Sequence, residues 1–177
     1  MLIIGLFYII LPLILIGLIV FKRQPNILSW VITIISFGSV IVYLWVTARW
    51  DLVSIYFRPI FPVLFLIASV VGYKRIKKPK TPQKKIVIIL GIVLNLVVIV
   101  FISGLNWFSF KGYATPENAI DLASPFHSGR QIVLHGGASP FTNGHFHVKP
   151  QNYALDIVGL NKLGMRSTSI SGGTDLE

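Results

Sequence analysis

Residues 86–108 read IVIILGIVLNLVVIVFISGLNWF, and this stretch decides the class of fold. It contains no charged residue, and about 20 residues of helix are enough to cross the hydrocarbon core of a bilayer. Asn95 lies near its middle, where a side-chain amide usually hydrogen-bonds to a neighbouring helix. The stretch therefore predicts a transmembrane helix.

Three further apolar segments lie upstream of this stretch. Residues 2–21 and 27–48 carry no charge, whereas residues 52–73 include Arg58, Pro59 and Pro62, which leave only residues 60–72 as an uninterrupted apolar run. Prolines interrupt helical hydrogen bonding, so we expect either that this third helix starts late and lies tilted or shallow, or that Arg58 extends to the lipid head groups. The pattern predicts four transmembrane helices within residues 1–110.

Composition supports the same class. Hydrophobic residues make up 54% of the chain and charged residues 12%, against roughly 25% charged in an average soluble domain. Residues 2–21 lack the basic start and the small-residue cleavage site of a secretory signal, so we interpret them as a retained anchor. The composition excludes an ordinary soluble domain.

Positive charge predicts the orientation in the membrane. The loop from Lys74 to Lys85 contains seven Lys and Arg residues and no acidic residue, and cytoplasmic loops carry such an excess. We expect this loop to be cytoplasmic, and the N-terminus, residues 49–58 and everything after about Lys111 to be extracytoplasmic. The net charge of +10 is thus concentrated beside the lipid bilayer, its expected partner, and does not indicate nucleic-acid binding.

The chain changes character after residue 110. Gly, Pro, Ser, Thr and Asn separate short apolar pieces, which is typical of β-rich structure. We expect a linker over residues 111–123, with a brief helix or turn at residues 115–121, and then the start of a small all-β extracytoplasmic domain over residues 124–177. Strands are predicted at residues 131–135 and 151–158. The chain has no cysteine, so disulfides and thiolate metal ligands are excluded.

Side chains that can bind a metal gather in residues 143–156, which read NGHFHVKPQNYALD. Imidazole nitrogens and carboxylate oxygens are the ligands of catalytic zinc, which usually has three protein ligands and one water. His145 and Asp156 are the candidate metal ligands. His147 is a candidate accessory ligand because alternate residues of an extended chain lie on one side. We expect His127 and His135 to be surface or loop residues.

The motif 143–145 (NGH) followed by residues 151–158 (QNYALDIV) resembles the first metal motif of the lysostaphin-type zinc endopeptidases, in a membrane-anchored branch. The resemblance covers residues 124–177. It implies that His145 and Asp156 are zinc ligands and that the substrate is a cell-wall peptide at the bacterial cell membrane. The second motif of that family, a downstream His-x-His that supplies a further ligand and a catalytic His, is absent, so we expect an incomplete peptidase domain with no catalytic residue in this chain.

Two functions remain open from the sequence. The first is a membrane-anchored zinc metalloendopeptidase, present as a fragment or truncated form. The second is a non-catalytic multi-pass membrane protein with a degenerate peptidase-like tail. A third zinc ligand distinguishes them, because two ligands do not form the three-ligand site of catalytic zinc.

Overall fold

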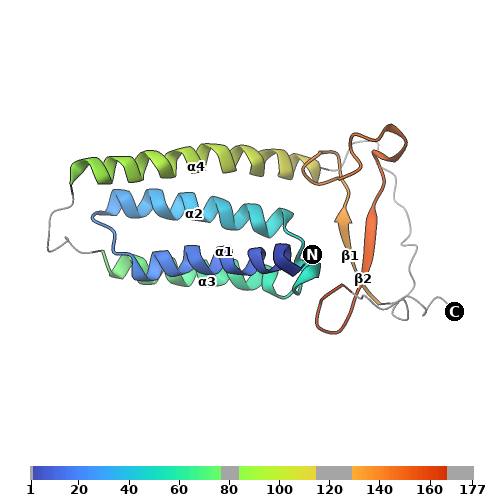
Figure 1. Cartoon of the computed structure of the whole chain (residues 1–177), viewed down its shortest axis with the longest axis horizontal. Coiled ribbons are helices and arrows are strands. Elements are labelled where there is room, and N and C mark those ends of the chain that lie inside the picture. The colour runs from blue at the N-terminus through green and yellow to red at the C-terminus, as the bar shows by residue number, and fades with distance from the viewer. Residues whose placement is uncertain (1, 77–83, 115–128, 167–177) are drawn as a thin grey trace.

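A computed structural model of the chain describes residues 2–76, 84–114 and 129–166, and Figure 1 shows its arrangement. Within these residues, four helices run alternately up and down along the long axis, and a small sheet lies at one end. The elements are α1 (Leu2–Phe21), α2 (Ile27–Thr47), the 3-10 helix η1 (Trp50–Leu52), α3 (Phe57–Lys74), α4 (Lys85–Gly112), β1 (Arg130–His135), the 3-10 helix η2 (Lys149–Gln151) and β2 (Asp156–Leu160).

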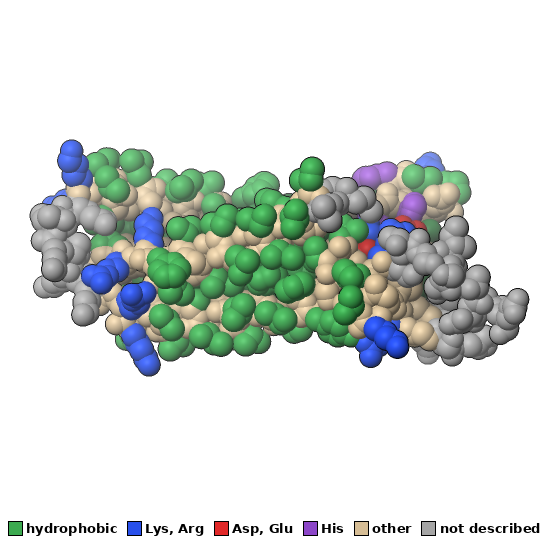
Figure 2. All heavy atoms as spheres, turned by 60° about the horizontal axis from the view of Figure 1, so that its bottom comes forward, with side chains coloured by type: hydrophobic (Ala, Val, Ile, Leu, Met, Phe, Trp, Pro, Cys, Tyr) green, Lys and Arg blue, Asp and Glu red, His purple; other side chains and the backbone are tan. Residues whose placement is uncertain are grey.

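Three of these helices, α2, α3 and α4, are long and apolar enough to cross a membrane. Helix α1 is also apolar, but its segment Gly5–Phe21 counts among the shorter apolar helices and not among the candidate spans, so a fourth span stays a prediction. Hydrophobic side chains cover the middle of the face seen in Figure 2, and Lys and Arg side chains lie towards its ends. The helical, membrane-associated class is confirmed.

Helix α3 begins earlier than the prolines suggested. It starts at Phe57 and includes both Pro59 and Pro62. Pro59 lies in the first turn, where a backbone N–H has no helical acceptor and its loss costs little. Arg58 donates from Nε to the carbonyl of Trp45 at 3.0 Å, and its guanidinium lies 5.1 Å from the centre of that indole ring. The predicted break is therefore part of the helix, fixed against the end of α2.

The buried apolar side chains belong to the first three helices and η1. One cluster joins Ile19, Ile41, Phe65 and Ala68, and a second joins Leu44, Trp50 and Phe61. Helix α4 buries only small or polar residues, Asn106, Ser109 and Gly112, in its contact with the rest of the described chain. Small residues let membrane helices approach closely, so α4 packs on α2 by shape and hydrogen bonding.

The interhelical amide contact expected of Asn95 occurs at another residue. Asn95 donates to Gly91 O within its own helix, at 2.8 Å. Asn106 donates from Nδ2 to Ser39 O of α2, at 3.0 Å. The expectation for Asn95 was wrong. The two residues lie eleven positions apart on nearly the same face of α4, but Asn95 lines a pocket between α4 and α2, whereas Asn106 reaches the α2 backbone.

Strands β1 and β2 form a two-stranded antiparallel sheet. Val133 pairs with Ile157 and His135 pairs with Asp156, so Leu134 is an extra residue that makes a bulge. The strand predicted at residues 131–135 is confirmed. The strand predicted at residues 151–158 was wrong in its bounds, because η2 and a turn occupy its first half and pairing begins at Asp156. Pro150 lies in η2, and proline cannot donate to a strand ladder.

Residues 129–166, called the sheet region below, are attached to the end of the helical bundle. Ala138 N–H donates to Gly112 O at 3.0 Å, at the end of α4. Ile55 N–H donates to Gly164 O at 2.9 Å, and Arg166 N–H donates to Asp51 O at 2.7 Å. The sheet thus lies against both α4 and the connection between α2 and α3. The predicted helix or turn at residues 115–121, His127, and residues 167–177 lie outside the described residues.

Candidate metal-ligand site

The two predicted metal ligands lie in contact. His145 Nε2 is 3.1 Å from Asp156 Oδ1 and 3.2 Å from Asp156 Oδ2. His145 belongs to the loop after β1, whereas Asp156 is the first residue of β2. Their side chains are 32% and 43% exposed, so a ligand from solvent can reach both. The fold therefore brings together two side chains that are eleven positions apart in the sequence.

Asn143 holds the loop that carries His145. Its side chain is buried, with 1% of the residue exposed. Its amide donates to Gly137 O at 3.2 Å and to Asn152 O at 2.8 Å, and its Oδ1 accepts from His145 N–H at 2.9 Å. The Asn of the Asn-Gly-His motif is thus the residue that fixes the backbone of His145. Sequence reasoning quoted this Asn without giving it a role.

His135 also lies at this site, contrary to the expectation of an unrelated surface residue. It is opposite Asp156 in the sheet, and its ring centre lies 6.4 Å from that of His145. Its Nδ1 accepts a hydrogen bond from Gly144 N–H at 3.3 Å. The signal that could have found it is strand pairing, because a His at the end of one strand faces the first residue of the strand that pairs with it.

The backbone around His147 is not the extended one on which the prediction of an accessory ligand rests. The backbone there forms turns, since Phe146 N–H donates to Asn143 O and Val148 N–H donates to His145 O. The His147 ring instead packs at 90° against the ring of Phe146, with centres 5.3 Å apart. Among the described residues, no hydrogen bond joins His147 to His145 or Asp156. The premise for an accessory ligand was therefore wrong.

The separation of His145 and Asp156 fits a shared zinc ion. Two ligands bound at about 2.05 Å in a tetrahedral site are about 3.3 Å apart, close to the 3.1 and 3.2 Å found here. A third ligand is not assembled: residues 2–76, 84–114 and 129–166 contain no group of three His, Asp or Glu side chains that could hold a metal. His135 is the nearest histidine by ring contact, but its Nδ1 is an acceptor from backbone, so its Nε2 carries the proton when the ring is neutral.

An open pocket of about 460 Å³ lies beside the pair. Its polar lining comes from Asp156, His135, Arg49 and Arg166. Arg49 forms a two-point ion pair with the buried carboxylate of Asp51, with both N–O distances 2.8 Å. This hydrogen bonding raises the pKa of Arg49, with burial acting against it. The pocket therefore combines Asp156 and His135 with two guanidinium groups, which suit anionic groups of a ligand.

Comparison of the chain with protein-family models, with curated proteins and with solved structures finds no match to any of them. The assignment of a function therefore depends on the residues of the site and on their geometry.

Proposed function

We propose that the protein is a membrane-anchored, zinc-dependent metalloendopeptidase whose sheet region acts on peptides of the bacterial cell wall. The observation that carries this proposal is the contact of His145 and Asp156, at the separation of two ligands of one zinc ion. The resemblance of residues 143–158 to the first metal motif of lysostaphin-type peptidases supports it.

The residues of the site suggest a division of work. His145 Nε2 and the Asp156 carboxylate would hold the metal, and Asn143 would keep His145 in place through its backbone N–H. A bound zinc ion supplies polarisation of a peptide carbonyl and a water of lowered pKa. Arg49, which Asp51 holds rigidly, would orient a carboxylate of the substrate at the edge of the pocket. A third ligand and a proton-transferring group remain to be supplied from outside these residues.

The same proposal includes an orientation in the membrane. Four spans would place the sheet region and the N-terminus outside the cell, and the Lys74 to Lys85 loop in the cytoplasm. The arrangement of charges supports this orientation. Six of the described Lys and Arg residues lie at the end of the bundle opposite the sheet, which is called the basic end below. These residues are Lys22, Arg23, Lys74, Arg75, Lys84 and Lys85.

Orientation can be measured by cysteine labelling, because the chain has no cysteine of its own. Single Tyr153→Cys and Lys84→Cys variants place one thiol in the sheet region and one at the basic end. A membrane-impermeant maleimide added to intact cells should label only Tyr153→Cys, and both after lysis. Labelling of Lys84→Cys in intact cells would contradict the orientation.

The catalytic proposal is tested with the native polypeptide, purified from its own membrane into lipid nanodiscs so that any further ligand is present, and incubated with purified cross-linked peptidoglycan. We expect release of peptide amines that stops on chelation and returns with zinc. His145→Ala and Asp156→Asn should each lower the rate by more than about 100-fold. Mutation even of residues that only orient the metal ligands lowers activity or metal affinity about 10- to 100-fold. His147→Ala is the matched control and should retain activity. Cleavage that survives both ligand variants would contradict a zinc peptidase.

A non-catalytic membrane protein is the second candidate. It is favoured by the observation that the described residues bring together two metal-competent side chains and not three. Such a protein would still bind zinc weakly through His145 and Asp156. Zinc binding that depends on both residues, combined with no peptide release under any condition, would select this alternative.

A further inference from the structure

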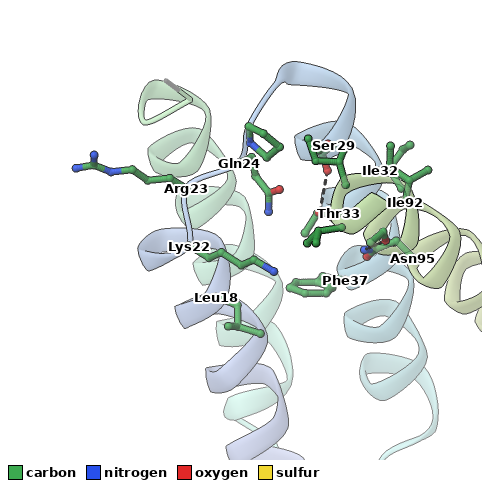
Figure 3. Close-up of a pocket in the computed structure, with 14 residues that line it drawn as sticks. Leu18, Lys22, Arg23, Gln24, Ser29, Ile32, Thr33, Phe37, Ile92 and Asn95 are labelled. Carbon is green, nitrogen blue, oxygen red and sulfur yellow. Dashed lines mark hydrogen bonds between the residues drawn. The ribbon is translucent and has the colours of Figure 1, made fainter. Parts of the chain in front are cut away.

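A pocket of about 170 Å³ opens at the basic end of the bundle, far from the sheet region (Figure 3). It lies between the end of α1, the connection to α2, the first turns of α2, and the first half of α4. Its apolar walls include Leu18, Phe37 and Ile92, and its polar lining includes Lys22, Gln24 and Ser29. One side is therefore apolar and continuous with the helices, while the rim is polar.

The side chain of Lys22, directly after α1, extends into this space, whereas that of Arg23, which also borders the pocket, points away from it (Figure 3). Within the described residues, the two ion pairs are Arg49 with Asp51 and His145 with Asp156. Lys22 thus has no carboxylate within ion-pair distance in the described part of the chain. Lys22 is exposed to solvent, so its charge is free to attract an anionic group that enters the pocket.

Ser29 provides a second, independent indication of a ligand. It lines the pocket with only 8% of its surface exposed, and its Oγ has no hydrogen-bond partner among the described residues. Its backbone groups are already satisfied, because its N–H donates to Asn26 Oδ1 at 2.8 Å and its carbonyl accepts from Thr33 Oγ1 at 2.8 Å. The Oγ is itself closed to solvent, so a ligand atom reaches it only after the side chain rotates towards the pocket, and it would then supply the acceptor that the buried hydroxyl lacks.

The apolar surface between α1 and α4, next to the pocket, is suited to an alkyl chain. Helix α1 packs mainly against α3, and α4 packs mainly against α2. Gly91 of α4 lines the pocket, and a Cβ added there would meet no atom within 4 Å. Leu18 of α1 is 42% exposed at the same place. Open apolar surface on both helices therefore leads from the polar rim along the bundle.

We propose that this pocket binds the headgroup phosphate of an anionic phospholipid. Lys22 supplies the charge, the Ser29 hydroxyl and the Gln24 amide donate hydrogen bonds, and one acyl chain lies along α1 and α4. The shared chemistry is that of a phosphate group, but the apolar surface between α1 and α4 assigns the ligand to a lipid and not to free phosphate. Basic pockets between membrane helices bind anionic headgroups in this way.

The test uses the full chain purified in detergent and native mass spectrometry after equilibration with mixed micelles of phosphatidylglycerol and phosphatidylcholine. We expect retention of one phosphatidylglycerol in preference to phosphatidylcholine. Lys22→Gln should weaken this binding about fivefold, because one Lys near an anionic headgroup contributes about that factor. Arg23→Gln removes the same charge one residue away and should change the binding less than twofold.

Ser29→Ala separates a ligand contact from a structural one. Since the hydroxyl has no partner among the described residues, this variant should unfold at the same temperature as the wild type without lipid, or higher. It should lose a large part of the rise in unfolding temperature that phosphatidylglycerol gives to the wild type.

Three results would overturn the proposal. Equal weakening by Lys22→Gln and Arg23→Gln would indicate general surface attraction. Equal retention of both lipids would exclude a headgroup site. Binding of inorganic phosphate that depends on Lys22, with no retained lipid, would assign the pocket to free phosphate.

Discussion

The helical bundle and the sheet region are stabilised in different ways. In the bundle, buried apolar side chains such as Trp50 and Phe65 join α1, α2, α3 and η1. In residues 129–166, by contrast, no hydrophobic side chain is buried, and the buried residues with side chains are Ser139, Thr142 and Asn143. Hydrogen bonds, close backbone contacts and the stacking of the partly exposed Phe141 on Phe108 of α4 therefore hold the sheet region on the bundle.

This difference places the candidate metal ligands on the weaker part of the molecule. A region without its own apolar core gains little folding free energy from the burial of apolar surface. A two-stranded sheet alone is also only marginally stable in water. A metal bound by His145 and Asp156 would stabilise the folded form of this region by mass action. The bundle is expected to keep its structure when the sheet region opens.

The largest expected effect is in the bundle. Trp50 is 3% exposed and packs against Phe61, with ring centres 5.9 Å apart. Trp50→Ala should lower the free energy of unfolding by about 4 kcal/mol, since it leaves a large cavity. Trp107→Ala, at a residue that is 64% exposed, is the control and should change it by less than about 1 kcal/mol. Denaturant unfolding in one detergent compares the two, and similar losses would contradict the assigned core.

The next effect is at the junction of the two regions. Arg49→Ala leaves the carboxylate of Asp51, which is 0% exposed, without its ion-pair partner. We expect a loss of about 3 kcal/mol, because an uncompensated buried charge is costly. The double variant Arg49→Ala with Asp51→Asn should recover part of this loss in the same unfolding measurement. A double variant that is less stable than the single one would show that the charge is not the cause.

Asn143→Ala should weaken the sheet region by about 2 kcal/mol, because it removes three hydrogen bonds from a buried site. Hydrogen exchange followed by mass spectrometry should show faster exchange in residues 129–166 and unchanged exchange in α2 and α3. Asn152→Ala is the control, because its backbone carbonyl, which accepts from Asn143, is retained. Equally faster exchange throughout the bundle would contradict the separation of the two regions.

Alanine substitutions at two glycines separate the cost of backbone strain from the cost of a steric clash with α4. Gly129 and Gly137 have φ values of 87° and 94°, and an alanine at such values costs about 1 to 2 kcal/mol. A Cβ at Gly129 would meet no atom within 4 Å, whereas one at Gly137 would collide with Gly112 O of α4. Gly137→Ala should therefore speed exchange in the sheet region more than Gly129→Ala. Equal effects would mean that the contact with α4 adds nothing.

The smallest expected effect is that of pH on the Arg49 ion pair. The pKa of Arg49 is raised above its ordinary value, chiefly by hydrogen bonding to Asp51. Its stabilisation is fully present below the unfolded pKa and is lost only as pH rises through the higher folded pKa. The difference in unfolding free energy between wild type and Arg49→Ala should stay constant between about pH 6 and pH 9. A difference that falls steadily with pH in this window would contradict the assignment.

Local sequence patterns predicted the helices well. The expected segment 27–48 forms α2 (Ile27–Thr47), because an uncharged apolar run with Asn26 before it has one favourable structure, and Asn26 caps the helix. The start of α3 was missed, since the first turn of a helix tolerates Pro59. The choice between Asn95 and Asn106 could not be made, because both lie on one face of α4 and the choice depends on where along its length α4 contacts α2 and where a pocket separates them.

The site was only half predictable. His145 and Asp156 were found from residue type and resemblance, and the structure brings them together. His135 was missed and the strand bounds at residues 151–158 were wrong for one reason: both depend on pairing with β1, which lies outside any local window. The turns that move His147 away depend on Asn143, whose bonds also join distant backbone groups.

The measurement that tests the central claim most directly is cobalt(II) binding to the full chain in nanodiscs, followed by visible absorption. We predict that wild-type protein binds the ion, and that His145→Ala and Asp156→Asn each abolish the absorption while His147→Ala leaves it unchanged. Wild-type protein that binds no ion, or binds it with spectra that both ligand variants reproduce, would contradict the assignment of His145 and Asp156 as metal ligands.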